Sequence, residues 1–158
     1  MSTKQEPGAE PDRELAQDLT QSEALIQRLP QARALGLRIT ALGEGRAEIH
    51  MPFHAQLVGD PETGVIHGGA VSTLMDTCGG AAVMAHPLVA GATATISLRI
   101  DYLRAATPGQ GITARAECHH VTRSVAFVRA LALDEDEENP VAMATGTFTV
   151  PQLREARS

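Results

Sequence analysis

The chain has 158 residues, a formal net charge of −6 at pH 7, 3% aromatic residues and no tryptophan. This length fits one domain with its own hydrophobic core. The negative charge and the scarcity of aromatic rings argue against a nucleic-acid-binding protein and against an anionic membrane surface. No apolar run is long enough to span a membrane. The polar first residues lack the apolar segment of a signal peptide, so we expect a cytoplasmic protein.

The two ends of the chain differ in composition from the middle. Residues 1–12 are rich in Glu, Pro and Gly, which predicts a disordered tail. Between residues 13 and 30, leucine and isoleucine recur at helical intervals, which predicts an N-terminal amphipathic helix ended by Pro30. We expect residues 31–152 to form the main domain and residues 153–158 to form a short C-terminal tail.

The main domain shows two β-like runs, then one helical segment, then four further β runs. The predicted strands are 36–40, 46–51, 92–104, 111–121, 124–133 and 141–150, and the predicted helix is 67–85. Residues 54–64 are expected to form a loop, and the acidic run 134–138 a solvated hairpin tip. This order predicts an α+β domain in which a curved antiparallel sheet wraps around a central helix.

Asp76 is the only charged residue between Glu62 and Arg99, with histidine counted as neutral. A helical projection places it with Gly69, Ser72, Thr73, Gly80 and Val83, on the side opposite Val71, Leu74, Met75, Cys78, Ala82 and Ala85. An acid on this side is usually solvated, but its neighbours are small residues rather than the Lys and Glu of a wet surface. Asp76 can therefore face solvent, a neighbouring subunit or a ligand, and we favour a functional role.

The predicted helix begins with the pair Gly68-Gly69. Free N–H groups at a helix N-terminus, aided by the helix dipole, bind an oxyanion or polarise a carbonyl group. A carboxylate two and a half turns further on supplies an acid that can attack or activate water. The combination favours acyl chemistry.

Other chemistries fit less well. His50 and His54 lie on either side of Pro52 and not on a helix, and the adjacent His119 and His120 point to opposite faces of a strand, so we expect no metal site. The sequence contains no Gly-x-Ser-x-Gly elbow and no glycine-rich nucleotide loop. The two cysteines form neither a zinc pattern nor a disulfide framework, and we interpret them as buried free thiols.

The helix motif and two later segments resemble a known family. The residues that carry the resemblance are His67, Gly68, Gly69, Leu74, Asp76 and Gly80, with the segments 97–104 and 122–127. They are similar to the HGGxxxxLxD signature of hotdog-fold acyl-CoA thioesterases, and most similar to the PaaI-like branch. The resemblance implies a hotdog fold and hydrolysis of an acyl-CoA to a free acid and CoA. It implies no cofactor, because CoA is part of the substrate.

The resemblance also implies roles for catalytic residues. Asp76 matches the catalytic acid, which acts as nucleophile or as general base on water. Gly68 matches the backbone donor to the thioester carbonyl, and His67 a residue that positions the thioester. Thr95 falls where relatives carry a Ser or Thr that orients the water.

Further residues match substrate-binding positions. Gly69 is expected to assist Gly68, Thr73 to contact the substrate, and Arg123 to meet the phosphates of CoA. The sequence departs from the family at one place: relatives often carry Asn six residues before the His, where this chain has Pro61. Proline has no amide side chain and cannot make the same hydrogen bond.

The family resemblance implies a homodimer whose sheets join edge to edge, with Asp76 of one subunit near His67 and Gly68 of the second. Two such dimers commonly form a homotetramer. The alternative is a non-catalytic acyl-CoA-binding or regulatory hotdog protein. Because a pure binding protein does not need Asp76, the sequence favours the enzyme.

Overall fold

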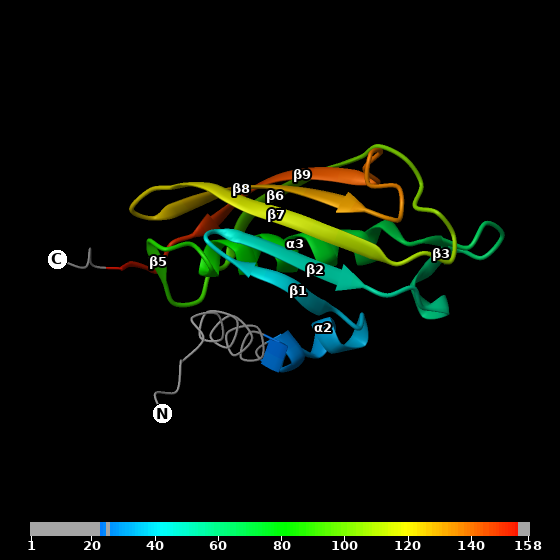
Figure 1. The fold of residues 1–158 in the computed structure, drawn as a ribbon, viewed down its shortest axis with the longest axis horizontal. Helices are drawn as coiled ribbons and strands as arrows, with labels where there is room; N and C mark the ends of the chain where they lie inside the picture. The colour runs from blue at the N-terminus through cyan, green and yellow to red at the C-terminus, as the bar shows by residue number, and fades with distance from the viewer. Residues whose placement is uncertain (1–22, 25, 155–158) are drawn as a thin grey trace, which may run out of the picture.

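A curved antiparallel sheet and one long helix make up the body of the protein (Figure 1). The computed structural model describes residues 23–24 and 26–154. The sheet has six strands in the order β1-β2-β7-β8-β9-β6, so that β1 and β6 form its edges. Its strands are β1 (Arg38–Gly43), β2 (Arg46–Met51), β6 (Thr95–Tyr102), β7 (Ile112–Val121), β8 (Val125–Leu133) and β9 (Ala142–Thr149), and the helix is α3 (Gly68–Met84). The predicted curved sheet around a central helix is confirmed.

Short elements connect these parts. They are α2 (Pro30–Ala34), the 3-10 turn η1 (Ala55–Leu57), β3 (Val58–Asp60), β4 (Val65–Ile66), β5 (Val89–Ala90) and β10 (Gln152–Leu153). The segment 54–64, expected to be a loop, therefore contains η1 and β3, and β3 pairs with β4. β10 pairs with β5 and extends one residue beyond the expected end of the domain at 152. Within the described residues, no helix is both long and apolar enough for a membrane span.

Most of the predicted N-terminal helix, 13–30, and the whole predicted tail, 1–12, lie outside the described residues. The described part, 23–24 and 26–27, is helical. Pro30 begins the separate short helix α2, where its missing N–H and fixed φ suit the first helical position.

The core lies between α3 and the concave face of the sheet. Leu74, Met75 and Cys78 are fully buried on this side of the helix. A Cβ atom added to Gly79 would lie 2.8 Å from the ring of Phe148, so only glycine lets β9 approach the helix this closely. The small residues of α3 thus have the packing role that their sequence pattern indicated.

The structure also tests two further expectations, the outward side of the helix and the state of the cysteines. Val83, placed on the outward side, is fully buried, because the sheet and β5 cover a wider arc of the helix than one face. Cys78 and Cys118 are both free and buried, as predicted. Burial raises the pKa of the Cys78 thiol to about 12, which leaves it protonated and unreactive at neutral pH.

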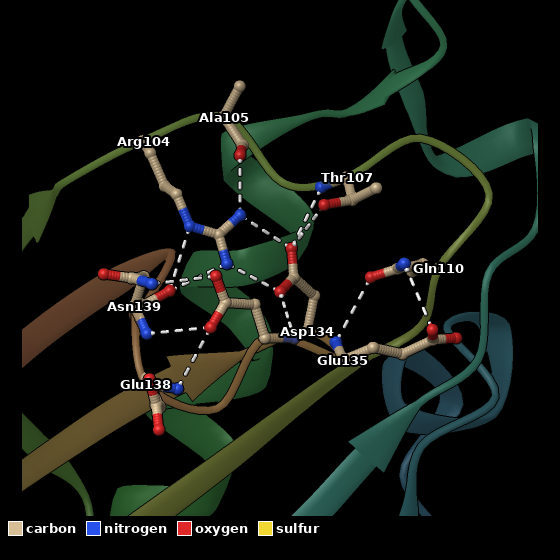
Figure 2. Close-up of polar contacts among 9 residues, drawn as sticks. Arg104, Ala105, Thr107, Gln110, Asp134, Glu135, Glu138 and Asn139 are labelled. Carbon is tan, nitrogen blue, oxygen red and sulfur yellow. Dashed lines mark hydrogen bonds and ion pairs between the residues drawn. The ribbon is translucent and has the colours of Figure 1, made fainter.

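The acidic run after β8 is exposed at residues 135–138, as expected, but Asp134 is buried, which corrects the expectation for that residue. The side chain of Asp134 is fully buried and forms a two-pronged ion pair with Arg104, at 2.6 and 2.7 Å (Figure 2). Further along the run, Glu137 pairs with Arg115 on β7. Sequence reasoning missed this because the partners are 30 and 22 residues away and are brought close only by the sheet.

The Arg104–Asp134 pair joins the segment after β6 to the segment after β8. Asp134 also accepts hydrogen bonds from the N–H and the hydroxyl group of Thr107, and Arg104 donates to the carbonyl oxygen of Asn139. Hydrogen bonding from the guanidinium of Arg104 is the main reason why the pKa of Asp134 lies well below its usual range. Burial acts in the opposite direction and raises this pKa. Because the charges are matched by hydrogen bonds, this cluster can stay ionised inside the protein.

We predict that Asp134→Ala lowers the free energy of unfolding by about 2–3 kcal/mol at pH 7, because it leaves the partly buried Arg104 unpaired. The lowered pKa means that the pair stabilises the folded state above the unfolded pKa of about 3.9 and loses this effect as the pH falls below it. Urea unfolding at pH 7 and pH 3 should show a smaller difference between variant and wild type at pH 3. Glu137→Ala, which breaks an exposed pair in the same loop, should change stability little. Equal unfolding curves for Asp134→Ala and wild type would contradict the prediction.

Candidate active site

Asp76 and Thr95, two residues predicted to act in catalysis, meet in the folded chain. Thr95 is the first residue of the edge strand β6, and its hydroxyl group donates a 2.7 Å hydrogen bond to Oδ1 of Asp76. Asp76 is half-buried, and it forms no ion pair with any other described residue. The bond fixes the carboxylate through one oxygen and leaves Oδ2 without a hydrogen-bond donor among the described residues.

The side of α3 that faces β6 is called the α3–β6 flank. Asp76 lies at one end of it, and His67 and the glycine pair lie at the other end, where α3 begins. His67 is the N-cap residue, and its Nδ1 atom accepts a 2.9 Å hydrogen bond from the N–H of Gly69. The N–H of Gly69, expected to assist in binding the carbonyl, is therefore already used. The N–H of Gly68 has no acceptor among the described residues, as expected for the first residue of a helix.

Tyr102, at the end of β6, is a residue that the sequence interpretation missed. Its hydroxyl group donates to the carbonyl oxygen of Gly68 at 2.6 Å and lies 2.7 Å from Oγ of Ser72. Ser72 also donates to the same carbonyl oxygen, at 3.0 Å. One signal was available: Tyr102 is the only tyrosine in the chain and lies in the segment 97–104.

A mainly apolar pocket of about 300 Å³ opens beside Gly68. Its lining residues are Val65, Ile66, Gly68, Val71, Tyr102, Leu103, Arg104, Ala105, Ala106 and Val141. The pocket lies between the start of α3 and the segment that follows β6. An apolar group bound here would have its polar end close to the free N–H of Gly68.

The structure does not bring Asp76 and Gly68 of one chain to a common point. They are eight residues apart on one helix, which corresponds to about 12 Å along its axis. A carbonyl carbon under attack must lie about 3–3.5 Å from the attacking atom. One chain therefore holds the two groups at opposite ends of the α3–β6 flank.

The remaining predicted site residues lie elsewhere. Thr73 is half-buried on α3, where its hydroxyl group donates to the carbonyl of Gly69 and accepts a long 3.4 Å bond from Gln31. Arg123 is exposed in the turn between β7 and β8, at the end of the sheet where β6 begins, and forms no ion pair with a described residue. Pro61 is exposed in the turn between β3 and β4.

A larger hollow of about 860 Å³ lies on the outer face of the sheet, away from α3. Its charged side chains alternate along the strands with buried alanines, so they point away from the helix. Glu117 pairs there with both Arg46 and Arg129, and Arg115 pairs with Glu48. Most of the charged side chains in this hollow are thus held in ion pairs.

Comparison with known proteins decides the family. Residues 63–141 match the model of the thioesterase superfamily. The chain belongs to this superfamily. It is 30% identical over 115 residues to the acyl-coenzyme A thioesterase PaaI of Escherichia coli, covering 73% of this chain and 78% of that protein. It is 27% identical over 143 residues to the medium/long-chain acyl-CoA thioesterase YigI of the same organism, covering 81% and 90%.

Solved structures agree with this assignment. The E. coli PaaI protein superposes with a TM-score of 0.73 at 26% identity, covering 86% of this chain and 95% of that one. A Pseudomonas aeruginosa protein superposes with a TM-score of 0.73 at 35% identity, covering 83% and 97%. The expected hotdog fold and the resemblance to PaaI-like thioesterases are confirmed, and this thioesterase-superfamily member is a thioester hydrolase.

We predict that His67→Ala lowers the free energy of unfolding by about 1 kcal/mol, because α3 loses the side chain that caps the Gly69 N–H. His67→Asn should recover most of this loss, since asparagine is a strong N-cap residue. The exposed His119 on β7, which makes no side-chain hydrogen bond to a described residue, provides the control His119→Ala. Thermal or urea unfolding measures all three variants. Equal stability of His67→Ala and wild type would show that the cap does not form.

Proposed function

We propose that the protein is an acyl-CoA thioesterase in which Asp76 supplies the catalytic carboxylate and the N–H of Gly68 binds the thioester carbonyl. The observation that carries this proposal is the Asp76–Thr95 pair: a carboxylate without a cationic partner among the described residues, held by one hydroxyl group beside an edge strand. Similarity to the named acyl-CoA thioesterases PaaI and YigI supports the substrate class.

The hydrogen bond from Thr95 defines how Asp76 can work. Because Oδ1 accepts the hydrogen bond of the Thr95 hydroxyl group, Oδ2 is the oxygen that remains to react with water or with the thioester. As a general base, it takes a proton from water while the water oxygen bonds to the carbonyl carbon. The C–S bond then breaks, and the proton passes to the leaving CoA thiolate. As a nucleophile, the same oxygen bonds to the carbonyl carbon and the C–S bond breaks, which gives a mixed anhydride and CoA thiolate. Water then hydrolyses the anhydride to the free acid, and the thiolate takes up the proton that this step releases.

The start of α3 binds the carbonyl group of the thioester in this proposal. The partial positive charge of the helix N-terminus and the free N–H of Gly68 stabilise the negative charge that develops on the carbonyl oxygen. The acyl group then enters the apolar pocket of about 300 Å³ beside Gly68. His67 borders this site as the cap of the helix and keeps the N–H of Gly69 occupied.

The 12 Å separation along α3 supports a site that combines two chains. Asp76 lies near the start of β6, through Thr95, and Gly68 near its end, through Tyr102. β6 is an edge strand with an exposed Ile96, and such edges are usually covered in native proteins. Antiparallel pairing of two β6 edges places the start of one beside the end of the other. Each homodimer then has two sites, and a homotetramer of two dimers remains a prediction.

Arg123 extends this proposal to CoA. It is exposed and forms no ion pair with a described residue. It lies at the end of the sheet where β6 begins, which is also the end near the Asp76–Thr95 pair. In the two-chain site this free cation can meet the phosphates of a CoA whose acyl end enters the pocket of the second chain. The cytoplasmic location expected from the sequence also remains a prediction.

We predict that Asp76→Asn lowers kcat for acyl-CoA hydrolysis by about a hundredfold or more, because the amide cannot accept the proton of water or attack. Thr95→Val should lower kcat by roughly tenfold, since it removes only the hydrogen bond to the carboxylate. Thr77→Val is the matched control, because that hydroxyl group bonds only to the backbone of Thr73. Thiol release from a panel of acyl-CoA esters measures the rates. Full activity of Asp76→Asn would exclude Asp76 as the catalytic carboxylate. Saturable acyl-CoA binding with no faster hydrolysis by the wild type than by Asp76→Asn would support the non-catalytic binding alternative.

The two-chain site predicts complementation between two inactive variants. Gly68→Pro removes the N–H yet suits the first helical position, whereas Gly68→Ala keeps the N–H and serves as the control for the added Cβ. Co-expressed Asp76→Asn and Gly68→Pro chains should regain about a quarter of wild-type activity, because half of randomly formed dimers hold one intact site of two. Each variant alone should be inactive. No recovery in mixed dimers, verified by two different affinity tags, would contradict a site shared between chains.

A further inference from the structure

The peptide group between Gly68 and Gly69 is held at both of its ends by side chains. Its carbonyl oxygen accepts from the hydroxyl group of Tyr102 at 2.6 Å and from that of Ser72 at 3.0 Å. Its N–H donates to Nδ1 of His67 at 2.9 Å. These three side chains come from β6, from the next turn of α3 and from the N-cap position, so they fix the peptide from three directions.

We propose that Tyr102, together with Ser72, is a positioning residue that aims the N–H of Gly68 at the thioester carbonyl. This inference rests on the proposed function, in which that N–H is the carbonyl-binding donor. Tyr102 does not touch the carbonyl group of the substrate in this role. It acts through the Gly68 backbone, whose own N–H lies on the peptide immediately before the one that is held.

Two consecutive glycines explain why this peptide group needs to be restrained by side chains. Glycine has more backbone freedom than any other residue, and the first helical turn has few internal hydrogen bonds to restrain it. A Cβ atom on Gly68 would lie 3.3 Å from the ring and the hydroxyl oxygen of Tyr102, and one on Gly69 would lie 2.9 Å from Nδ1 of His67. The absent side chains thus make room for the groups that restrain the turn.

The number of hydroxyl protons shows that the hydroxyl groups of Tyr102 and Ser72 act together. Tyr102 donates its single proton to the carbonyl oxygen of Gly68. Ser72 also has one proton, which it can give either to that carbonyl oxygen or to the tyrosine oxygen 2.7 Å away. Two protons therefore serve three contacts, and loss of either hydroxyl group changes the hydrogen bonding of the other.

The position of Tyr102 favours a role at the site over a role in the core. The residue is 49% exposed and lies at the end of an edge strand, so removing its hydroxyl group leaves the core unchanged. Its side chain also lines the pocket beside Gly68. The contact ties β6, the proposed dimer edge, directly to the first turn of α3.

Tyr102→Phe tests the proposal, because it removes the hydroxyl group and keeps the ring. We expect a roughly tenfold lower kcat with little change in KM, a smaller loss than the hundredfold or more that follows removal of an oxyanion donor itself. Ser72→Ala should act in the same direction, and the double variant should lose less than the product of the two single losses. Thr77→Val, which removes a hydroxyl group that bonds only to the backbone of Thr73, is the control.

Two substrate analogues separate positioning from a general structural effect. A ketone analogue with CH₂ in place of the thioester sulfur keeps the carbonyl group, and a thioether analogue lacks it. Tyr102→Phe should weaken binding of the ketone analogue by roughly tenfold and leave binding of the thioether analogue unchanged. Unfolding curves of the variant should match those of the wild type.

Several results would overturn the proposal. Unchanged kcat and unchanged ketone binding in Tyr102→Phe would exclude the positioning role while the proposed function stands, provided that the wild type is active. Equal weakening of both analogues would assign the effect to the shape of the pocket instead. A wild-type protein that hydrolyses no acyl-CoA ester would overturn the proposed function and the positioning role with it.

Discussion

The close packing of α3 against the curved sheet is the constraint on which the rest of the structure depends. Gly79 lets the ring of Phe148 on β9 come within contact of the helix, and Leu74 and Met75 fill the space beside it. Because this side of the helix is committed to the core, the other side faces the edge strand β6. Asp76, Thr95, Gly68 and Tyr102 all lie along that flank, so the packing of the core also decides where the proposed chemistry can occur.

Both ends of the flank are tied to the fold by side-chain contacts. At one end, the hydroxyl group of Thr95 holds Asp76. At the other, Tyr102 is bonded to Gly68, and two residues further on Arg104 anchors the chain to the buried Asp134 (Figure 2). The ion pair therefore supports the segment that follows Tyr102 and lines the apolar pocket, although it contains no group that acts on a substrate.

In the proposed function, each chain holds two half-sites rather than one complete site. The helix rise separates the carboxylate from the carbonyl-binding turn by about 12 Å, a distance that no side-chain rotation closes. In the proposed function, a second chain brings the missing half, so the enzyme would depend on assembly. The free edge of β6, which runs from one half-site to the other, supports the same arrangement.

The order of elements and their approximate limits could be read from the sequence. Strand and helix periods differ clearly, and proline and glycine mark the turns, so the helix predicted at 67–85 is found at Gly68–Met84. Asp76 stood out because a long apolar segment contains no other charge. Gly68 stood out as a free N–H at the predicted helix N-terminus, and the resemblance to the family added His67 and Thr95 as candidates.

Contacts between distant residues could not be read in this way. The partner of Asp134 and the hydrogen bond from the hydroxyl group of Tyr102 to Gly68 were both unforeseen. The sequence by itself determined the kinds of element and the residues able to carry acyl chemistry, because these follow from local periodicity and side-chain type. Only the tertiary structure decided which of those groups meet, because strand pairing and sheet curvature bring together residues that are far apart in the chain.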